Sequence, residues 1–465
     1  MMNGHFHTRT TGWVLALALA IGAASPARAQ DPTQGAGQGP APGAEEGTAP
    51  ATGQGATPTT GQGATPTTGQ GTAQGTEQTG GQGGPDPTIA EPDTTMQIYG
   101  FAMMDMGYQG EQNDPLWYDV LRPTKLPAFR HEFGRDNRWF QGIRQSRFGV
   151  KTTTPTSLGE FKTTFEFDLF GVGPDAGQTT IRMRDVYGDL GHFLAGQADS
   201  PFMDGSTFPN ILEYWGPNGM VYFKNVQFRY TPWHGDNEVE IAIERPGASA
   251  DAGIFASRIE LQNVQGRFPV PDLSAHYRAT RGWGHVQVAG ILRLMRWDDL
   301  LEDPFDLSGH AWGWGINTTS NLKLGSDTVH LGVVFGEGVE NYMNDAPIDV
   351  GTRVNPGNRR SPVVGEALPL VGMLAFYDRT WNDHWTSSAG YSRLDIDTSS
   401  GQLPLDFKTG QYAIGNLLYL PVPNVMMGGE FQWGRRDNNS DGFSSHDYRV
   451  QFSFKYNFDY KLGGK

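Results

Sequence analysis

Apolar and polar residues alternate along most of the chain after Met96. Near the C-terminus, aromatic and aliphatic side chains occupy every second position from Tyr448 to Phe458, and polar side chains occupy the positions between them. Residues 161–169 alternate in the same way. A period of two gives a β-strand one apolar face and one polar face. The pattern therefore predicts an all-β fold.

The alternation divides the chain after Met96 into sixteen segments. The predicted strands are 96–108, 141–153, 159–170, 178–190, 192–199, 219–231, 236–246, 272–281, 284–296, 309–323, 326–338, 368–380, 384–397, 405–420, 424–437 and 444–458.

The connections between these segments alternate in length. Short turns fall near Pro155, Leu190, Pro232, Gly282, Gly325, Asn382 and Pro421. Long loops fall at 109–140, 200–218, 247–271, 297–308 and 339–367. Short turns at one rim and long loops at the other are typical of transmembrane β-barrels, which must close so that every backbone amide is paired. We expect a 16-stranded antiparallel barrel over residues 96–465, with both termini on the periplasmic side. A secreted sandwich or propeller is the alternative, and it would bury the apolar face in a core.

Four tryptophans accompany the predicted short turns. They are Trp233, Trp283, Trp381 and Trp385. Tryptophan is enriched at the level of lipid headgroups, so a group of four at one rim favours the barrel.

The N-terminal region differs in composition from the rest. Arg9, the apolar run 13–24 and the sequence Ala-Arg-Ala before Gln30 predict a signal peptide over residues 1–29. Residues 30–95 are rich in Gly, Gln, Thr, Pro and Ala and contain no aromatic residue. This composition cannot offset the entropy of ordering the backbone, so we predict a disordered periplasmic segment.

Charge and cysteine content exclude several functions. The net charge of −15 argues against a nucleic-acid partner, and the absence of Cys excludes thiolate catalysis and thiolate zinc sites. No stretch is long and apolar enough for a membrane-spanning helix. The eleven histidines show no metal-ligand spacing, so neither catalysis nor a metal or other cofactor is expected.

Several strings resemble the DcaP-like outer-membrane porins. They are RQSRFG at 144–149, GEFKTTFEFD at 159–168, TTIRMRDVYGDLG at 179–191, FLAGQ at 193–197, EYWGPNG at 213–219 and VQFRYTP at 226–232. The resemblance implies a trimer of sixteen-stranded barrels that passes small organic anions, dicarboxylates among them, without catalysis. The chain departs from the family where the N-terminal segment lacks coiled-coil heptads, and where Asp459 to Lys465 follow the terminal aromatic residue.

The polar face of each predicted strand indicates which side chains line the lumen. The basic residues at inward positions are Arg147, Lys151, Arg182, Arg184, Arg229, Arg278 and Arg293. Opposite them we expect the loop at 200–218 to fold inward with Asp204 and Glu213 as constriction residues. Such a basic wall would favour anions. The alternative is that these cations only neutralise Glu166, Asp168, Glu240 and Glu244.

Two charged residues fall on the apolar parity. Asp185 shares the face of Met183, and Lys224 shares the face of Val226. A charge facing acyl chains is costly, so we expect a subunit interface at these positions. A β-bulge at Asp185, or a Lys224 side chain reaching the headgroups, is the alternative.

These patterns together predict an outer-membrane porin of a Gram-negative bacterium. Passive diffusion of small hydrophilic solutes, such as organic anions, is the expected function. The expected partners are the lipid bilayer, lipopolysaccharide and two further copies of the chain. The alternatives are a structural or adhesive barrel with a plugged lumen and, less favoured, an outer-membrane hydrolase.

Overall fold

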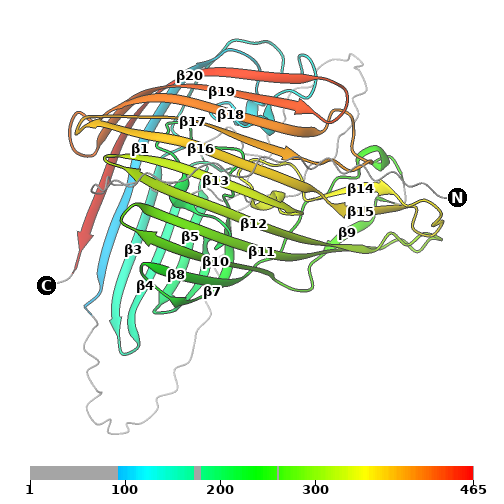
Figure 1. Ribbon diagram of the computed structural model, residues 1–465, viewed down its shortest axis with the longest axis horizontal. Coiled ribbons are helices and arrows are strands. Elements are labelled where there is room, and N and C mark those ends of the chain that lie inside the picture. Colours follow the sequence, from blue (N-terminus) through cyan, green and yellow to red (C-terminus); the bar gives the residue numbers. More distant parts are fainter. Residues whose placement is uncertain (1–92, 172–179, 259–260, 464–465) are drawn as a thin grey trace, which may run out of the picture. The chain divides into compact units, whose positions relative to one another are not determined.

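The computed structural model describes residues 93–171, 180–258 and 261–463. The strands of the main sheet are β1 (Thr95–Gln109), β2 (Arg138–Gly142), β3 (Arg147–Thr156), β4 (Gly159–Asp168), β5 (Arg182–Leu190), β6 (Phe193–Asp199), β7 (Lys224–Trp233), β8 (Asn237–Glu244), β9 (Val264–Arg267), β10 (Asp272–Arg281), β11 (Gly284–Asp299), β12 (Gly309–Leu324), β13 (Asp327–Glu337), β16 (Pro369–Asn382), β17 (Trp385–Ile396), β18 (Phe407–Tyr419), β19 (Val425–Asn438) and β20 (Ser444–Leu462) (Figure 1). A separate hairpin consists of β14 (Val350–Val354) and β15 (Val363–Ala367).

Short 3₁₀ helices lie in the connections. They are η1 (Pro115–Trp117), η2 (Pro123–Lys125), η3 (Gly205–Thr207), η4 (Gly253–Phe255) and η6 (Glu340–Tyr342). Among the described residues, no helix has the length and apolar character needed to span a bilayer.

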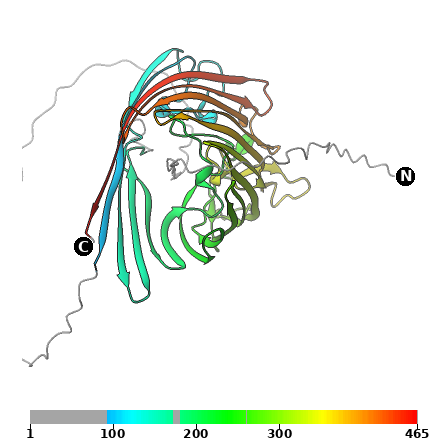
Figure 2. The ribbon, with the colours of Figure 1, turned by 60° about the vertical axis from the view of Figure 1, so that its left-hand side comes forward.

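The sheet closes on itself through its first and last strands. β1 pairs with β20 from Met96–Leu462 to Gln109–Arg449 and, on its other edge, with β3 and β2 (Figure 2). The main sheet has 18 segments, but β2 with β3 and β9 with β10 each form one interrupted strand. The result is the predicted closed antiparallel barrel of sixteen strands.

The structure differs from the predicted segments mainly at their ends. β20 continues past Phe458 to Leu462, because residues 459–462 pair with β1. A turn in which the Ser146 amide donates to the Ile143 carbonyl separates β2 from β3. β9 and the β14–β15 hairpin lie in segments predicted as loops. The predicted signal peptide, and the predicted disordered segment up to residue 92, lie outside the described residues.

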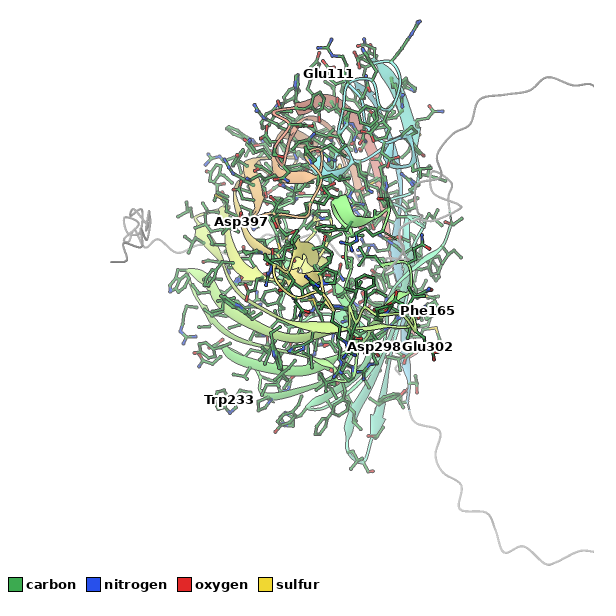
Figure 3. The ribbon with its side chains drawn as sticks, turned by 90° about the vertical axis from the view of Figure 1, so that its right-hand side faces the viewer. Glu111, Phe165, Trp233, Asp298, Glu302 and Asp397 are labelled. Atoms are coloured by element: carbon green, nitrogen blue, oxygen red, sulfur yellow. The ribbon has the colours of Figure 1, made fainter. Side chains whose placement is uncertain are left out.

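The apolar parity of the strands faces outward and the polar parity faces inward. On β20, Phe452 is 55% exposed, whereas its neighbours Gln451 and Ser453 are buried. Figure 3 shows Phe165 and Trp233 at the outer surface, and both are exposed. Trp233, Trp381 and Trp385 are exposed at the ends of strands joined by short turns, and Trp283 lies in such a turn. This distribution is that of a barrel whose outer surface meets hydrocarbon.

The inner surface has an apolar part that the alternation did not predict. Inward side chains of β13, β16 and β17, such as Val334, Leu374 and Leu394, are buried. They form one cluster with loop side chains that include Phe202 and Tyr342. Loops that fold into the barrel therefore cover this side of the wall and narrow the lumen.

We predict that the outward position of Phe452 tolerates no cation. F452R would place a guanidinium at the middle of the apolar band and lower the free energy of unfolding by about 2–4 kcal/mol. Denaturant unfolding of the protein in lipid bilayers measures this cost. Y460R is the matched control, because Tyr460 is also exposed on β20 but lies at the strand end, where the cost falls to about 0–1 kcal/mol. Equal costs for the two variants would contradict the lipid-facing assignment.

Candidate functional site: the lumen constriction

Three loops meet inside the barrel. They are the first loop (110–137), the inward loop (200–223) and the β13–β14 loop (338–349). The Trp215 indole of the inward loop donates to the Asn344 carbonyl at 2.7 Å. Asp345 of the β13–β14 loop accepts from Arg122 Nε at 2.8 Å and from the Thr124 amide at 2.9 Å in the first loop. The inward fold of the loop after β6 is thus confirmed, and two further loops complete the constriction.

Buried carboxylates hold the inward loop through its backbone. Glu430 of β19 accepts from the Leu212 amide at 2.7 Å and from the Glu213 amide at 2.9 Å. Glu213 accepts from the Leu121 amide at 3.1 Å and the Tyr412 hydroxyl at 3.1 Å, so it joins the inward loop to the first loop and to β18. Burial raises the pKa of Glu213 to about 7, although backbone hydrogen bonds oppose the shift.

Asp204 fixes the inward loop to the wall near its start. Its carboxylate is fully buried and lies 2.7 Å from His285 Nε2, 2.7 Å from Thr319 Oγ1 and 3.4 Å from Arg278 Nη1. Burial alone would raise the pKa of Asp204, but the contacts with His285 and Arg278 outweigh it and hold the pKa well below its usual range. The inward loop is therefore anchored near its start and at its middle.

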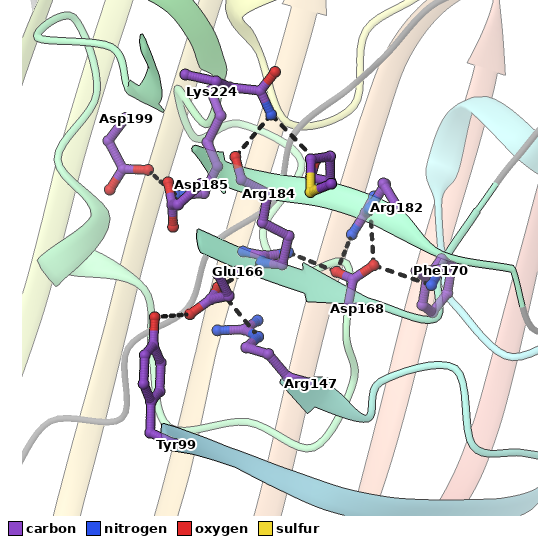
Figure 4. Close-up of polar contacts among 12 residues, drawn as sticks. Tyr99, Arg147, Glu166, Asp168, Phe170, Arg182, Arg184, Asp185, Asp199 and Lys224 are labelled. Carbon is purple, nitrogen blue, oxygen red and sulfur yellow. Dashed lines mark hydrogen bonds and ion pairs between the residues drawn. The ribbon is translucent and has the colours of Figure 1, made fainter. Parts of the chain in front are cut away.

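A chain of ion pairs connects β3, β4 and β5 on the opposite wall. Asp168 accepts from Arg182 Nη2 at 2.7 Å and from Arg184 Nη1 at 2.7 Å. Glu166 accepts from Arg184 Nε at 2.9 Å and lies 3.6 Å from Arg147 Nε (Figure 4). The Tyr214 hydroxyl of the inward loop also bonds to Asp168, so this wall and the inward loop touch.

The remaining predicted basic residues lie on other parts of the wall. Arg229 pairs with Glu240 at 2.7 Å, and Arg293 pairs with Asp272 and Asp349, both at 2.9 Å. The structure does not bring these two together with the β3–β5 chain. Lys151 is exposed near the short-turn end of β3.

Several of the paired arginines reach the solvent more than their carboxylate partners do. The side chain of Arg278 is 26% exposed and that of Asp204 is 0% exposed. The values are 10% against 0% for Arg182 and Asp168, and 10% against 1% for Arg122 and Asp345. Each of these three pairs carries no net charge, but its more exposed member is the arginine, which donates the hydrogen bonds.

The expectation that Asp185 and Lys224 face outward at a subunit interface is wrong, and the alternative of a β-bulge at Asp185 is confirmed. A bulge in β5 pairs Glu166 with Asp185 and Phe167 with Met183, so Arg184 and Asp185 both turn inward. Lys224 lies at the end of β7, where its ammonium is buried 2.8 Å from Asp185 and also contacts Asp199. Both charges are neutralised within one chain, so they need no subunit contact.

Sequence reasoning missed the arginines of the first loop and its surroundings. The Arg122 guanidinium lies between Trp117 and Trp215, with its carbon 4.4 Å and 4.0 Å from the ring centres. Arg144 is fully buried, pairs with Asp119 and lies 4.2 Å from the centre of the Phe170 ring. Only its place in the string RQSRFG marked Arg144, because alternation does not extend into turns.

One group of side chains has the spacing of a metal site among the described residues. The ligand atoms of Glu238, Glu240 and His276 lie within 4.8 Å of one another. Arg229 already pairs with Glu240, and His276 Nδ1 lies 3.2 Å from the Pro201 carbonyl. The arginine supplies the positive charge that an ion would bring, so we assign no metal here.

We predict that Asp204 determines the order of the inward loop. D204A leaves Arg278 without its buried counter-charge, and loss of one partner of a buried pair costs about 3–5 kcal/mol. Amide hydrogen exchange of residues 200–212 in detergent micelles should accelerate strongly. D395A is the control, because Asp395 pairs with the half-exposed Arg393 on β17. Unchanged protection of residues 200–212 in D204A would refute the anchor.

The chain is similar to known outer-membrane proteins. The family model described as DcaP outer membrane protein matches residues 140–458. The structure of the outer membrane channel DcaP of Acinetobacter baumannii has a TM-score of 0.65 and 19% identity, with 78% of this chain and 97% of that chain covered. In-vitro folded OmpT, an outer membrane protein of Vibrio cholerae, has a TM-score of 0.47 and 12% identity, with 80% and 100% covered. No curated protein sequence matches the chain. Because the family model covers more than half of the sequence, the chain belongs to the DcaP outer membrane protein family.

Proposed function

We propose that this channel passes small hydrophilic organic anions, dicarboxylates among them, by passive diffusion. The observation that carries the proposal is the unequal exposure of the ion pairs at the constriction. Arg122, Arg182 and Arg278 reach the solvent, whereas their carboxylate partners are at most 1% exposed. An anion is attracted to the nearer, positive end of each pair, and a cation is repelled by it.

The distribution of carboxylates nearer the short-turn rim limits this preference. The side chains of Glu238 on β8 and Asp378 on β16 are 31% and 21% exposed, each beside a histidine. Acids thus lie on the β8 and β16 side, and the β3–β5 side carries arginines. We propose that anions follow the arginine side. Neutralisation of the wall without selectivity is the opposing reading, because every predicted lumen arginine has a carboxylate partner.

The assembly in the membrane is also part of the proposal. We place the short-turn rim and both chain ends in the periplasm, since export leaves the N-terminus there. Residues 1–29 would be removed as a signal peptide, and residues 30–95 would remain as a periplasmic segment. A homotrimer in a bilayer with lipopolysaccharide, as the resemblance implies, would cover part of the outward apolar surface.

A plugged structural barrel is the second candidate. The inward loop supports it, because Leu212, Glu213 and Asn218 are each at most 1% exposed. In this reading the three loops stabilise the barrel and leave no continuous path for solute. Catalysis has no comparable support.

A reversal potential in a KCl gradient tests the proposed selectivity. We predict a permeability ratio that favours chloride over potassium. R278Q should lower this ratio about threefold, the effect of one unit charge about 7 Å away across water. R393Q is the control, because Arg393 is also solvent-accessible, with a side chain 40% exposed against 26% for Arg278, but lies on the outward face of β17. Potassium preference in the wild-type channel would refute the anion assignment.

The pKa of Glu213 predicts a pH dependence of the same ratio. Below about pH 7 the buried carboxyl is neutral, and above it a negative charge appears at the constriction. The chloride preference should therefore fall about twofold between pH 6 and pH 8. E213Q keeps the side-chain shape without the ionisation and should be flat over this range. A pH response that persists in E213Q would assign the titration to another group.

A further inference from the structure

Two lysines on the inner wall lack the carboxylate partners that the lumen arginines have. They are Lys151 on β3 and Lys455 on β20. Among the described residues, neither ammonium has an acid within 4.0 Å or a hydrogen-bond acceptor. Lys455 is only 8% exposed and has no counter-ion among the described residues. A buried unpaired ammonium is costly, and a bound anion would remove that cost.

Aromatic rings at successive inward positions of β1 contact the two lysines. The Lys455 ammonium lies 4.0 Å from the centre of the Phe101 ring, and the Lys151 ammonium lies 4.6 Å from the centre of the Tyr99 ring. The strand register explains this arrangement. Met103, the next inward residue after Phe101, pairs with Lys455, and Gln97, the inward residue before Tyr99, pairs with Lys151. Cation–π contacts hold the lysine ends but supply no negative charge.

The surrounding charges leave this part of the wall positive. Arg147 also approaches Phe101, with its guanidinium carbon 5.3 Å from the ring centre. Its carboxylate partner, Glu166, also accepts from Arg184 and from the Tyr99 hydroxyl. The inward carboxylate of β1, Asp105, accepts from Ser453 and from two glutamines, and no cation of the described residues lies within 4.0 Å of it. Arg147 therefore shares Glu166 with Arg184, and no carboxylate of the described residues lies within 4.0 Å of either lysine.

The two lysines lie on the short-turn side of the constriction. Leu212 of the inward loop packs with Met103, and Phe101 lies at the edge of that contact. The lysines thus lie between the inward loop and the short-turn rim, and Lys151 is exposed. We infer that Lys151 and Lys455, held on Tyr99 and Phe101, form a second anion site that takes the carboxylate group of a small solute after it has passed the constriction. This inference rests on the proposed function and extends it to a place and a ligand group.

The test compares the lysines with a lysine of the same wall that has a partner. K151M and K455M keep the apolar stems and remove the charges, alone and together. K162M is the matched control, because Lys162 on β4 shares the inward parity but pairs with Glu160 at 3.3 Å. The experiment uses the full mature protein in planar bilayers. Reversal potentials are measured in a KCl gradient, and single-channel conductance is measured over a range of potassium acetate concentrations.

We expect each single lysine variant to lower the anion-to-cation permeability ratio about threefold and the double variant to lower it more. In the wild-type channel, conductance should saturate with acetate concentration, and in the double variant it should rise linearly. K162M should match the wild type in both measurements. If Lys455 variants do not insert, K151M alone gives the test, because its side chain is exposed.

The outcomes separate this inference from the proposed function. An anion-selective wild-type channel whose double variant matches K162M would overturn the lysine site and leave the proposed function in place. A cation-selective wild-type channel would overturn both. A threefold loss in K162M equal to that in K151M would also overturn the site, because the effect would then follow net charge and not this position.

Discussion

Pairing of backbone amides is the constraint on which the rest of the structure depends. A sheet surrounded by hydrocarbon cannot leave an edge unpaired, so the first and last strands must meet. β1 is paired on both edges over most of its length, because β20 covers residues 96–109 on one edge and β3 and β2 cover residues 95–101 and 105–109 on the other. The four residues beyond Phe458 extend β20 to Leu462 and complete the pairing of the first residues of β1. The outward apolar side chains then face lipid, and the charges of the inward side chains must be stabilised in a narrow polar interior.

The interior solves this second problem by pairing charges within the chain. Asp168 accepts from two arginines, and Glu166 accepts from an arginine and a tyrosine. Asp204 and Glu430 hold the inward loop to the wall. A buried ion must be paired or hydrogen-bonded to be tolerated. Pairing removes net charge but not polarity, because in three pairs the arginine side chain is more exposed than its carboxylate partner. The same contacts therefore stabilise the loops and set the charge that a solute meets.

Alternation predicted the barrel well because lipid and lumen impose opposite polarity on successive residues of every strand. It failed at Asp185, because a single extra residue in β5 turns the Asp185 side chain from the outer to the inner face. It also failed at Lys224, which is the first residue of β7. A bulge leaves no mark in the alternation except the misplaced charge itself.

The three-loop constriction could not be predicted from the sequence for a different reason. Its contacts, such as Glu430 with the Leu212 amide and Asp345 with Arg122, join segments more than 200 residues apart, and no local pattern encodes them. The unpaired Lys455 stood on the predicted polar face of the last strand, but its lack of a partner became visible only in three dimensions.

The central claim is that a continuous aqueous path passes the three inward loops. Single-channel recording of the purified full-length mature protein in planar bilayers tests it most directly. The account predicts discrete current steps whose size is proportional to voltage. Insertion of correctly folded barrels without any current step would contradict it, and would show that the loops close the lumen.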